Sequence, residues 1–214
     1  MTFLRRTPIR CLAVVLILGL VFLPIPIPFR IAVLAGAALV WTYLEAGSLA
    51  PIGLRRRRRL PTTLLWGIGV AVAVTVFDEV TRPTIEQLLG IKPDYSVYGP
   101  LVGNEKAALQ MLGLALTSAA IGEEVLFRGF LLNQLTAILG TGRTRQWVAI
   151  VAGGVIFGAG HLAQGPLGIF NASMIGVIFG WAWFRTDRNL WATILAHGLI
   201  DTFGIAMLYL GRYS

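Results

Sequence analysis

Charged residues are scarce in this sequence. They make up only 13% of its 214 residues, whereas 56% of the residues are hydrophobic and the mean hydropathy is +0.75. A soluble domain carries about 25% charged residues, so the composition excludes a protein with a water-covered surface. It predicts instead an all-α protein whose helices form a bundle in the lipid bilayer.

Cysteine is nearly absent. Cys11 is the only one, which excludes an intramolecular disulfide and a cysteine-based metal cluster. The chain also lacks an internal repeat, a low-complexity tract and a linker. We therefore expect one integral membrane unit.

Acidic residues are outnumbered by basic ones, 10 to 18, which gives a net charge of +8. Strong basicity can indicate a nucleic-acid partner. Here, however, the densest arginine run, Arg55–Arg59, stands between two apolar stretches. Such a run beside membrane spans is typical of a topology signal, so we expect the bilayer, and no nucleic acid, as the partner.

Seven apolar stretches are candidates for transmembrane helices, each of which needs about 20 mostly apolar residues. They run approximately over residues 11–24, 28–44, 61–77, 106–139, 146–162, 167–184 and 190–210. Arginines precede the first stretch, as in a signal peptide, but Pro24–Pro28 follows it in place of a small-residue cleavage site. We therefore expect a retained helix and a tight turn.

The fourth predicted span is too long for the bilayer. A continuous helix over this span would measure about 50 Å, whereas the hydrocarbon core is about 30 Å thick. The helix must therefore tilt, protrude, or break near Gly122 or Gly129.

Seven spans place alternate loops on opposite sides of the membrane, and the basic residues are shared unevenly between the sides. One set of loops holds twelve of them: Arg5, Arg6, Arg10, Arg55–Arg59, Arg143, Arg145, Arg185 and Arg188. The other set holds five: Arg30, Arg82, Lys92, Lys106 and Arg212. The positive-inside rule then predicts a cytoplasmic amino terminus and an external loop over residues 78–105. We expect the protein in a bacterial cytoplasmic membrane.

Ionisable side chains occur inside three of the predicted spans. They are Glu123, Glu124, Arg128, His161, His197 and Asp201. An ionisable group at the middle of a bilayer costs at least about 2.5–3.5 kcal/mol on insertion scales. Such groups are usually retained because they face a polar interior and have a function there, so these residues are the candidates for a functional site.

Helical spacing sorts the candidates into pairs. Glu124 and Arg128 are four residues apart and can pair on one helix face, which leaves Glu123 about 100° around the helix. His197 and Asp201 are also four apart, so Asp201 can fix the tautomer of the histidine or share a metal ion with it. We expect Glu124 and Arg128 in a supporting role and Glu123 at the reaction centre.

His161 has two predicted neighbours. Phe157 lies one turn earlier on the same helix face, and Glu123 lies at the same depth in the bilayer. The two depths are about 22 and 24 Å from the turn that joins their antiparallel helices. A carboxylate and an imidazole at one depth can activate a water molecule and protonate a leaving amine, as peptide hydrolysis requires.

Two mechanisms of water activation fit these residues. In one, Glu123 and His161 act without a metal. In the other, Zn²⁺ is bound by His161, His197 and one or both of the Asp201 and Glu123 carboxylates, because three protein ligands plus water is the usual catalytic arrangement. The sequence lacks the H-E-x-x-H ligand pair of common zinc proteases, which disfavours the metal without excluding it.

Two functions without catalysis are alternatives. A proton-coupled transporter also uses intramembrane Glu, His and Asp side chains to relay protons, although no inverted repeat is evident in the sequence. A membrane protein that serves in binding or immunity could use the same helices as a scaffold only.

The ordered motifs Glu123-Glu124-x-x-x-Arg128, Phe157-x-x-x-His161 and His197-x-x-x-Asp201 resemble those of a known family. This is the CPBP family of intramembrane proteases (CAAX protease and bacteriocin-processing, also called ABI). The resemblance covers about residues 105–210 and includes the stretch 185–191 ahead of the last motif. It implies a catalytic helical core over residues 106–214, preceded by membrane helices and the external loop over residues 1–105.

The resemblance also implies roles for the motif residues. Glu123 and His161 would activate a water molecule that attacks a membrane-associated protein or peptide, and His197 and Asp201 would bind the scissile carbonyl or its oxyanion. Asparagine fills the Asp201 position in the family's eukaryotic enzyme, which acts on prenylated CAAX proteins. An ionised aspartate cannot donate a hydrogen bond to an oxyanion, so Asp201 must be protonated, orient His197 or ligate a metal.

The arginine distribution makes the topology testable. A reporter fused after Arg58 should be cytoplasmic and one inserted beside Tyr98 should be external, because basic loops are retained on the cytoplasmic side. Reporter activity in intact cells checks both positions. Access to the Arg55–Arg59 run from outside intact cells would contradict the seven-span arrangement.

Overall fold

The structure is a computed structural model that describes residues 3–54 and 59–213. Within these ranges the chain is helical and contains no strand. The longer helices are α1 (Thr7–Gly19), α2 (Ile27–Ala46), α3 (Leu60–Leu89), α4 (Glu105–Leu114), η4 (Ala115–Leu131), α5 (Leu132–Leu139), α6 (Arg143–Ala159), α7 (Gly165–Arg185) and α8 (Leu190–Tyr209). The short 3₁₀ turns are η1 (Leu20–Phe22), η2 (Ala50–Ile52), η3 (Ser96–Tyr98) and η5 (Leu162–Gln164).

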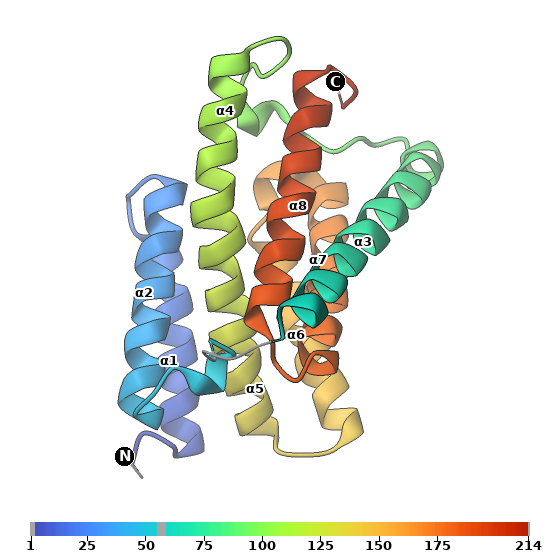
Figure 1. The fold of residues 1–214 in the computed structure, drawn as a ribbon. Coiled ribbons are helices and arrows are strands. Elements are labelled where there is room, and N and C mark those ends of the chain that lie inside the picture. Colours follow the sequence, from blue (N-terminus) through green and yellow to red (C-terminus); the bar gives the residue numbers. More distant parts are fainter. Residues whose placement is uncertain (1–2, 55–58, 214) are drawn as a thin grey trace.

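The connections alternate between two ends of the bundle, as predicted (Figure 1). The amino terminus lies at one end with turn η2 and the α5–α6 and α7–α8 connections. The carboxyl terminus lies at the other end with the α1–α2, α3–α4 and α6–α7 connections. We call these the amino-terminal and carboxyl-terminal ends of the bundle.

Most helices have the length and the surface of membrane spans. Among the described residues, five helices are long and apolar enough to cross a bilayer: Ile27–Ala46, Leu60–Leu88, Glu105–Leu139, Leu162–Arg185 and Leu190–Tyr209. Thr7–Phe22 is a shorter apolar helix, and α6 has 17 residues. Large apolar side chains face outwards, for example Leu65 with 73% of its surface exposed. The chain is therefore an integral membrane protein, a bundle of about seven helices.

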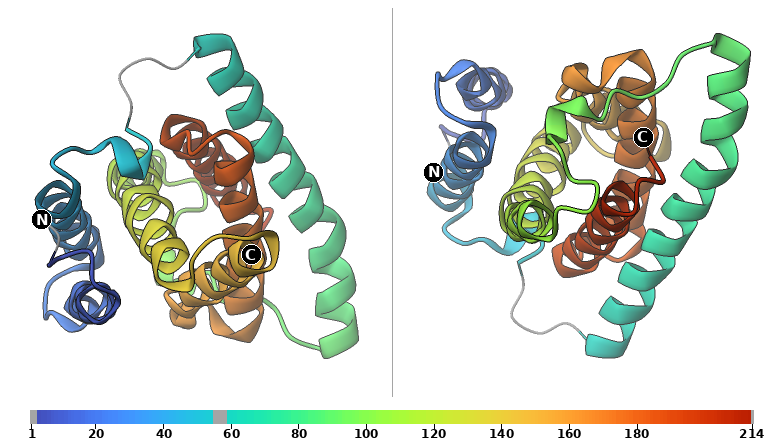
Figure 2. Two further views of the ribbon diagram at one scale, coloured as in Figure 1. Left: turned by 90° about the horizontal axis from the view of Figure 1, so that it is seen from below. Right: turned by 90° about the horizontal axis from the view of Figure 1, so that it is seen from above.

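The long central helix lies between two layers of the bundle. Figure 2 shows α1 and α2 on one side of it and α3 crossing the opposite, outer side of α8 and α7. Glycines allow the close contacts: an added Cβ at Gly122 would lie 2.7 Å from Ile31 Cγ2, and one at Gly129 would lie 3.0 Å from Ile52 Cβ. The two glycines are thus contact points for α2 and η2, and neither breaks the helix.

The α6–α7 pair is packed through small residues as well. An added Cβ at Gly176 would lie 2.8 Å from the Cα atom of Gly154, and one at Gly154 would lie 2.6 Å from Val177 Cγ2. Small residues at such positions let two backbones approach closely, which is the usual packing of helices in membranes.

The central helix is continuous from Glu105 to Leu139, but its middle section is wound differently from its ends. Residues Ala115–Leu131 form a π-helix, with hydrogen bonds that span five residues; the last of these joins the Leu132 N–H to the Phe127 carbonyl. π-helical turns are rare in proteins, and those that occur often lie at functional sites. This section carries Glu123, Glu124 and Arg128.

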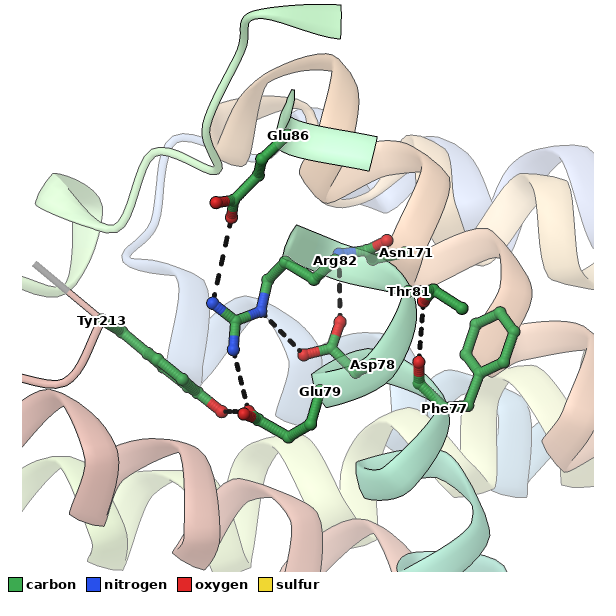
Figure 3. Close-up of polar contacts among 8 residues, drawn as sticks. All are labelled: Phe77, Asp78, Glu79, Thr81, Arg82, Glu86, Asn171 and Tyr213. Carbon is green, nitrogen blue, oxygen red and sulfur yellow. Dashed lines mark hydrogen bonds and ion pairs between the residues drawn. The ribbon is translucent and has the colours of Figure 1, made fainter. Parts of the chain in front are cut away.

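The prediction for the end of the third span is wrong. Helix α3 continues to Leu89, so Asp78 lies within the helix, and the predicted loop over residues 78–105 shrinks to residues 90–104. Arg82 explains the extension, because it forms ion pairs with Asp78 at 3.2 Å and with Glu79 at 2.8 Å (Figure 3). Pairs at these spacings stabilise a helix, and a hydropathy criterion does not detect them.

A buried carboxylate joins three helices at the amino-terminal end. Glu45 of α2, whose side chain is 7% exposed, contacts Arg10 of α1 at 2.5 Å. Its other oxygen accepts a hydrogen bond from Gln134 Nε2 of α5 at 2.6 Å. The Arg5 side chain donates to the Glu45 backbone carbonyl. These contacts hold α1 and α2 against the end of the central helix.

Removing the Glu45 carboxylate should destabilise the bundle. Glu45→Ala leaves Arg10 and Gln134 without their partner, and loss of one member of a buried ion pair costs about 3–5 kcal/mol. We expect a clearly lower melting temperature in detergent, whereas Glu105→Ala at the exposed start of α4 should change it little. Equal melting temperatures for the two variants would contradict this role of Glu45.

Candidate active site

Three segments bring the predicted residues together. Helix η4 supplies Glu123, Glu124 and Arg128, the turn after α6 supplies His161, and α8 supplies His197 and Asp201. Gly198 allows α8 to approach η4 beside His197, because an added Cβ there would lie 3.0 Å from Leu116 Cδ2. The close contact of these two helices places the second histidine against the glutamate pair.

Glu124 is the centre of the buried half of the site. Its side chain is 0% exposed, and its Oε1 atom lies 2.9 Å from Arg128 Nη1 and 2.9 Å from His197 Nδ1. The structure therefore forms the Glu124–Arg128 pair that the spacing predicts. It also adds a contact that the spacing does not predict, between Glu124 and a histidine 73 residues later.

This contact sets the tautomer of His197. With Nδ1–H donating to the Glu124 carboxylate, the Nε2 atom points to the other side, where Asp201 Oδ2 lies 3.7 Å away. That distance is too long for a hydrogen bond. Within the described part of the chain, Asp201 Oδ2 has no hydrogen-bond partner. In this structure Glu124, rather than Asp201, makes the hydrogen bond that orients His197.

Two aromatic rings enclose the Arg128 guanidinium. Its central carbon lies 4.5 Å from the centre of the Phe157 ring and 4.8 Å from that of Phe179. Phe157 also packs against both histidines, with ring centres 4.8 Å from His161 and 6.3 Å from His197. Cation–π contacts of this kind are strongest when water is excluded, so the rings help to hold a charged side chain inside the bundle.

His161 lies just beyond its helix instead of inside it. Helix α6 ends at Ala159, and the His161 backbone N–H bonds to the Gly158 carbonyl in the turn that follows. Its Nδ1 atom lies 3.0 Å from the Phe157 carbonyl oxygen, so Nδ1 carries the hydrogen of the neutral ring. The Nε2 lone pair is then available to accept a proton.

Glu123 lies on the more open side of the helix, half-buried, next to the fully buried Glu124. Among the described residues it has no hydrogen bond or ion pair, and it lies within electrostatic reach of His197 and Asp201. The structure shows no direct contact between Glu123 and His161, which the depth argument places at one level. Glu123 and His161 each interact electrostatically with His197.

The zinc arrangement does not fit the present positions of the side chains. In the ranges that the structure describes, no three His, Cys, Asp or Glu side chains converge as metal ligands. The predicted set of His161, His197, Asp201 and Glu123 therefore does not form a ligand cage in the described part of the chain.

The comparison with known families covers the segment that contains all of these residues. Residues 105–203 match the family model described as "Type II CAAX prenyl endopeptidase Rce1-like". This segment belongs to the CPBP family. No curated protein and no solved structure matches the chain. The segment that carries the predicted motifs therefore matches a family of membrane endopeptidases, as the motifs predict.

Two contributors to the CPBP site were missed in the sequence. Phe179 gives no signal, because it is one of many apolar residues in α7. Tyr98 lies outside the matched segment, in turn η3, and its hydroxyl accepts a hydrogen bond from Gln164 Nε2. Burial, with the negative charges of Asp201 and Glu123, raises the pKa of Tyr98 to about 12. No helical periodicity links this tyrosine to the motifs.

The two glutamates should differ in their effects on stability. Glu124→Gln and Arg128→Ala each leave a buried charge without its partner, at a cost of about 3–5 kcal/mol. Both variants should lower the melting temperature in detergent and the amount of folded protein in the membrane. Glu123→Gln removes no contact and should leave both quantities near those of the wild type. Equal destabilisation by Glu123→Gln and Glu124→Gln would contradict this division.

Proposed function

We propose that this chain is an intramembrane endopeptidase that hydrolyses a peptide bond of a membrane-associated protein or peptide through a water molecule activated by Glu123 and His161. The observation that carries the proposal is that one part of the site is fully buried and hydrogen-bonded, whereas the neighbouring part keeps some exposed surface. Glu124 and Arg128 are fully buried and bonded, whereas Glu123 and His161 are half-buried and the His197 and Asp201 side chains keep 11% and 24% of their surface exposed. Reactive groups therefore remain accessible to water beside a fixed scaffold.

Glu123 is suited to act as the general base. Its carboxylate has no protein partner among the described residues, so it can accept a hydrogen bond from water. The Phe157 carbonyl accepts the Nδ1 hydrogen of His161, so the Nε2 lone pair of the neutral ring is free to assist in the proton transfer. As the water oxygen bonds to the scissile carbonyl carbon, its proton passes to Glu123. The proton then moves to the amine nitrogen as the C–N bond breaks.

His197 is suited to stabilise the negative charge that develops on the carbonyl oxygen. Its Nδ1–H is held by the ionised Glu124, which favours the positively charged form of the ring. A charged His197 carries a second hydrogen on Nε2, and this hydrogen can bond to the oxyanion. Asp201, 3.7 Å from Nε2, adds a negative charge that keeps the proton on this atom before the substrate binds.

The substrate class follows from the location of the site. A peptide must reach residues in the middle of helices that cross the bilayer, so the substrate is a protein or peptide held at the membrane. The family's description names CAAX prenyl endopeptidases, and a prenylated tail fits a host that prenylates proteins. In a bacterial cytoplasmic membrane the corresponding substrate is a peptide precursor or a membrane protein.

Glu123→Gln should abolish cleavage without unfolding the protein. Glutamine keeps the volume of the side chain and removes the base, so the loss should appear in kcat. His161→Ala should have the same effect, and the double variant should be no worse than either single one, because residues that act as a unit are not additive. The substrate is found by sequencing new amino termini in membranes that contain the wild type or Glu123→Gln, and kcat is then measured on the cleaved segment.

Glu105→Gln is the matched control, since it changes an exposed glutamate at the start of the same long helix. It should cleave at the wild-type rate. Substantial cleavage by Glu123→Gln would remove Glu123 from the mechanism. Stoichiometric zinc in active protein, lost together with activity on chelation, would replace the metal-free mechanism by the zinc mechanism.

A further inference from the structure

Tyr98 reaches the site from the connection between α3 and α4. Its hydroxyl oxygen accepts a hydrogen bond from Gln164, which lies three residues after His161 in turn η5. The carboxylates of Asp201 and Glu123 act electrostatically on this hydroxyl. Tyr98 is therefore held beside the turn that follows His161, within electrostatic range of two groups that we assign to the reaction.

Several contacts hold the connection in this position. The Tyr95 ring stacks on Tyr98 with centres 6.4 Å apart, and on Tyr213 with centres 5.6 Å apart. The Arg82 guanidinium lies 4.2 Å above the centre of the Tyr213 ring. Figure 3 shows Arg82 among Asp78, Glu79 and Glu86, with Tyr213 beside Glu79. The stack thus runs from an ion-paired arginine on α3 to the tyrosine at the site.

The backbone of the connection is tied to the same turn as the Tyr98 side chain. The Asp94 N–H donates to the Gln164 carbonyl oxygen at 3.2 Å, and the Asp94 side chain accepts from the Ser96 N–H at 2.9 Å. Gln164 therefore binds the connection twice, once through its backbone and once through its side chain. This arrangement fixes the hydroxyl of Tyr98 relative to His161.

The site has few hydrogen-bond donors. Glu123, Glu124 and Asp201 accept hydrogen bonds when ionised, and the neutral His161 presents a lone pair. Among the catalytic groups assigned above, His197 Nε2 is the one donor that faces the reaction centre. Tyr98 changes this balance, because Gln164 bonds to its oxygen and leaves its hydrogen available. A pKa of about 12 keeps that hydrogen in place at neutral pH.

We propose that Tyr98 is a catalytic residue that donates its hydroxyl hydrogen to the oxyanion at the scissile carbonyl, and that Gln164 is the residue that positions it. The assignment rests on the proposed endopeptidase activity. It supplies the donor that an ionised Asp201 cannot provide. It also places a catalytic group on the α3–α4 connection, outside the segment that matches the CPBP family.

Removing the Tyr98 hydroxyl tests the assignment. Loss of one oxyanion donor lowers kcat by about 100- to 1000-fold, so Tyr98→Phe should show a loss of this size with a much smaller change in KM and an unchanged melting temperature. The probe is a synthetic peptide that spans the site cleaved in membranes, assayed with the full-length protein in detergent. Tyr95→Phe is the matched control: it keeps the stacking ring, and its hydroxyl lies beside the Arg82 cluster, so kcat should stay at the wild-type value.

Two further variants separate donation from packing. Gln164→Met keeps the volume and removes the amide that holds Tyr98, so it should lower kcat, and it should add nothing in the Tyr98→Phe background. Asp201→Asn introduces an amide donor near the proposed position of the oxyanion. The loss of kcat caused by Tyr98→Phe should therefore be smaller in the Asp201→Asn background than in the wild type. An equal loss in both backgrounds would overturn the oxyanion role.

The outcomes also separate this assignment from the proposed function. If Glu123→Gln is inactive and Tyr98→Phe keeps the wild-type kcat, the Tyr98 assignment is wrong and the endopeptidase function stands. A Tyr98→Phe effect confined to KM or to the melting temperature overturns the assignment in the same way. If no cleavage depends on Glu123, both the function and the assignment that rests on it are wrong.

Discussion

The carboxylate of Glu124 is the group on which the rest of the site depends. A single oxygen of this side chain binds both Arg128 and His197 at 2.9 Å. A buried carboxylate without partners would be strongly destabilising, and here a guanidinium and an imidazole compensate it. Phe157 and Phe179 in turn enclose the guanidinium. One interaction network therefore joins the central helix to α6, α7 and α8 and fixes one of the two histidines.

Two consecutive glutamates have opposite environments because they point to different sides of one helix. Glu124 faces the packed interior, where its pairing leaves it no freedom to exchange a proton with a substrate. Glu123 is half-buried on the open side and has no partner in the described part of the protein. The same chemical group thus serves as a scaffold at one position and is available as a base at the next. Both glutamates lie in the π-helical section of the central helix.

The order of the helices and the Glu124–Arg128 pair were predictable, because hydropathy and a four-residue spacing are local signals. The end of α3 was not, since Arg82 stabilises the helix through ion pairs beyond the apolar stretch. The π-helix was not predictable either, because no periodic pattern of residue types marks a change in backbone hydrogen bonding. Tyr98 and the contact between Glu124 and His197 join distant segments, so only the packing of the helices reveals them. Gly158 and Gly160 were the available signal that α6 ends before His161.

The two histidines differ in the partner of Nδ1, and under the proposed function this difference separates their roles. A neutral backbone carbonyl holds His161, and it orients the ring without requiring a positive charge, so Nε2 can act as an acceptor. An ionised carboxylate holds His197, and it stabilises the charged ring, so Nε2 can act as a donor. Peptide hydrolysis needs both functions within one site: a group that takes a proton from water and a group that donates to the oxyanion. In the proposed mechanism His161 supports Glu123, which takes the proton from water, and His197 donates to the oxyanion. The two imidazoles serve these different purposes because their Nδ1 partners differ.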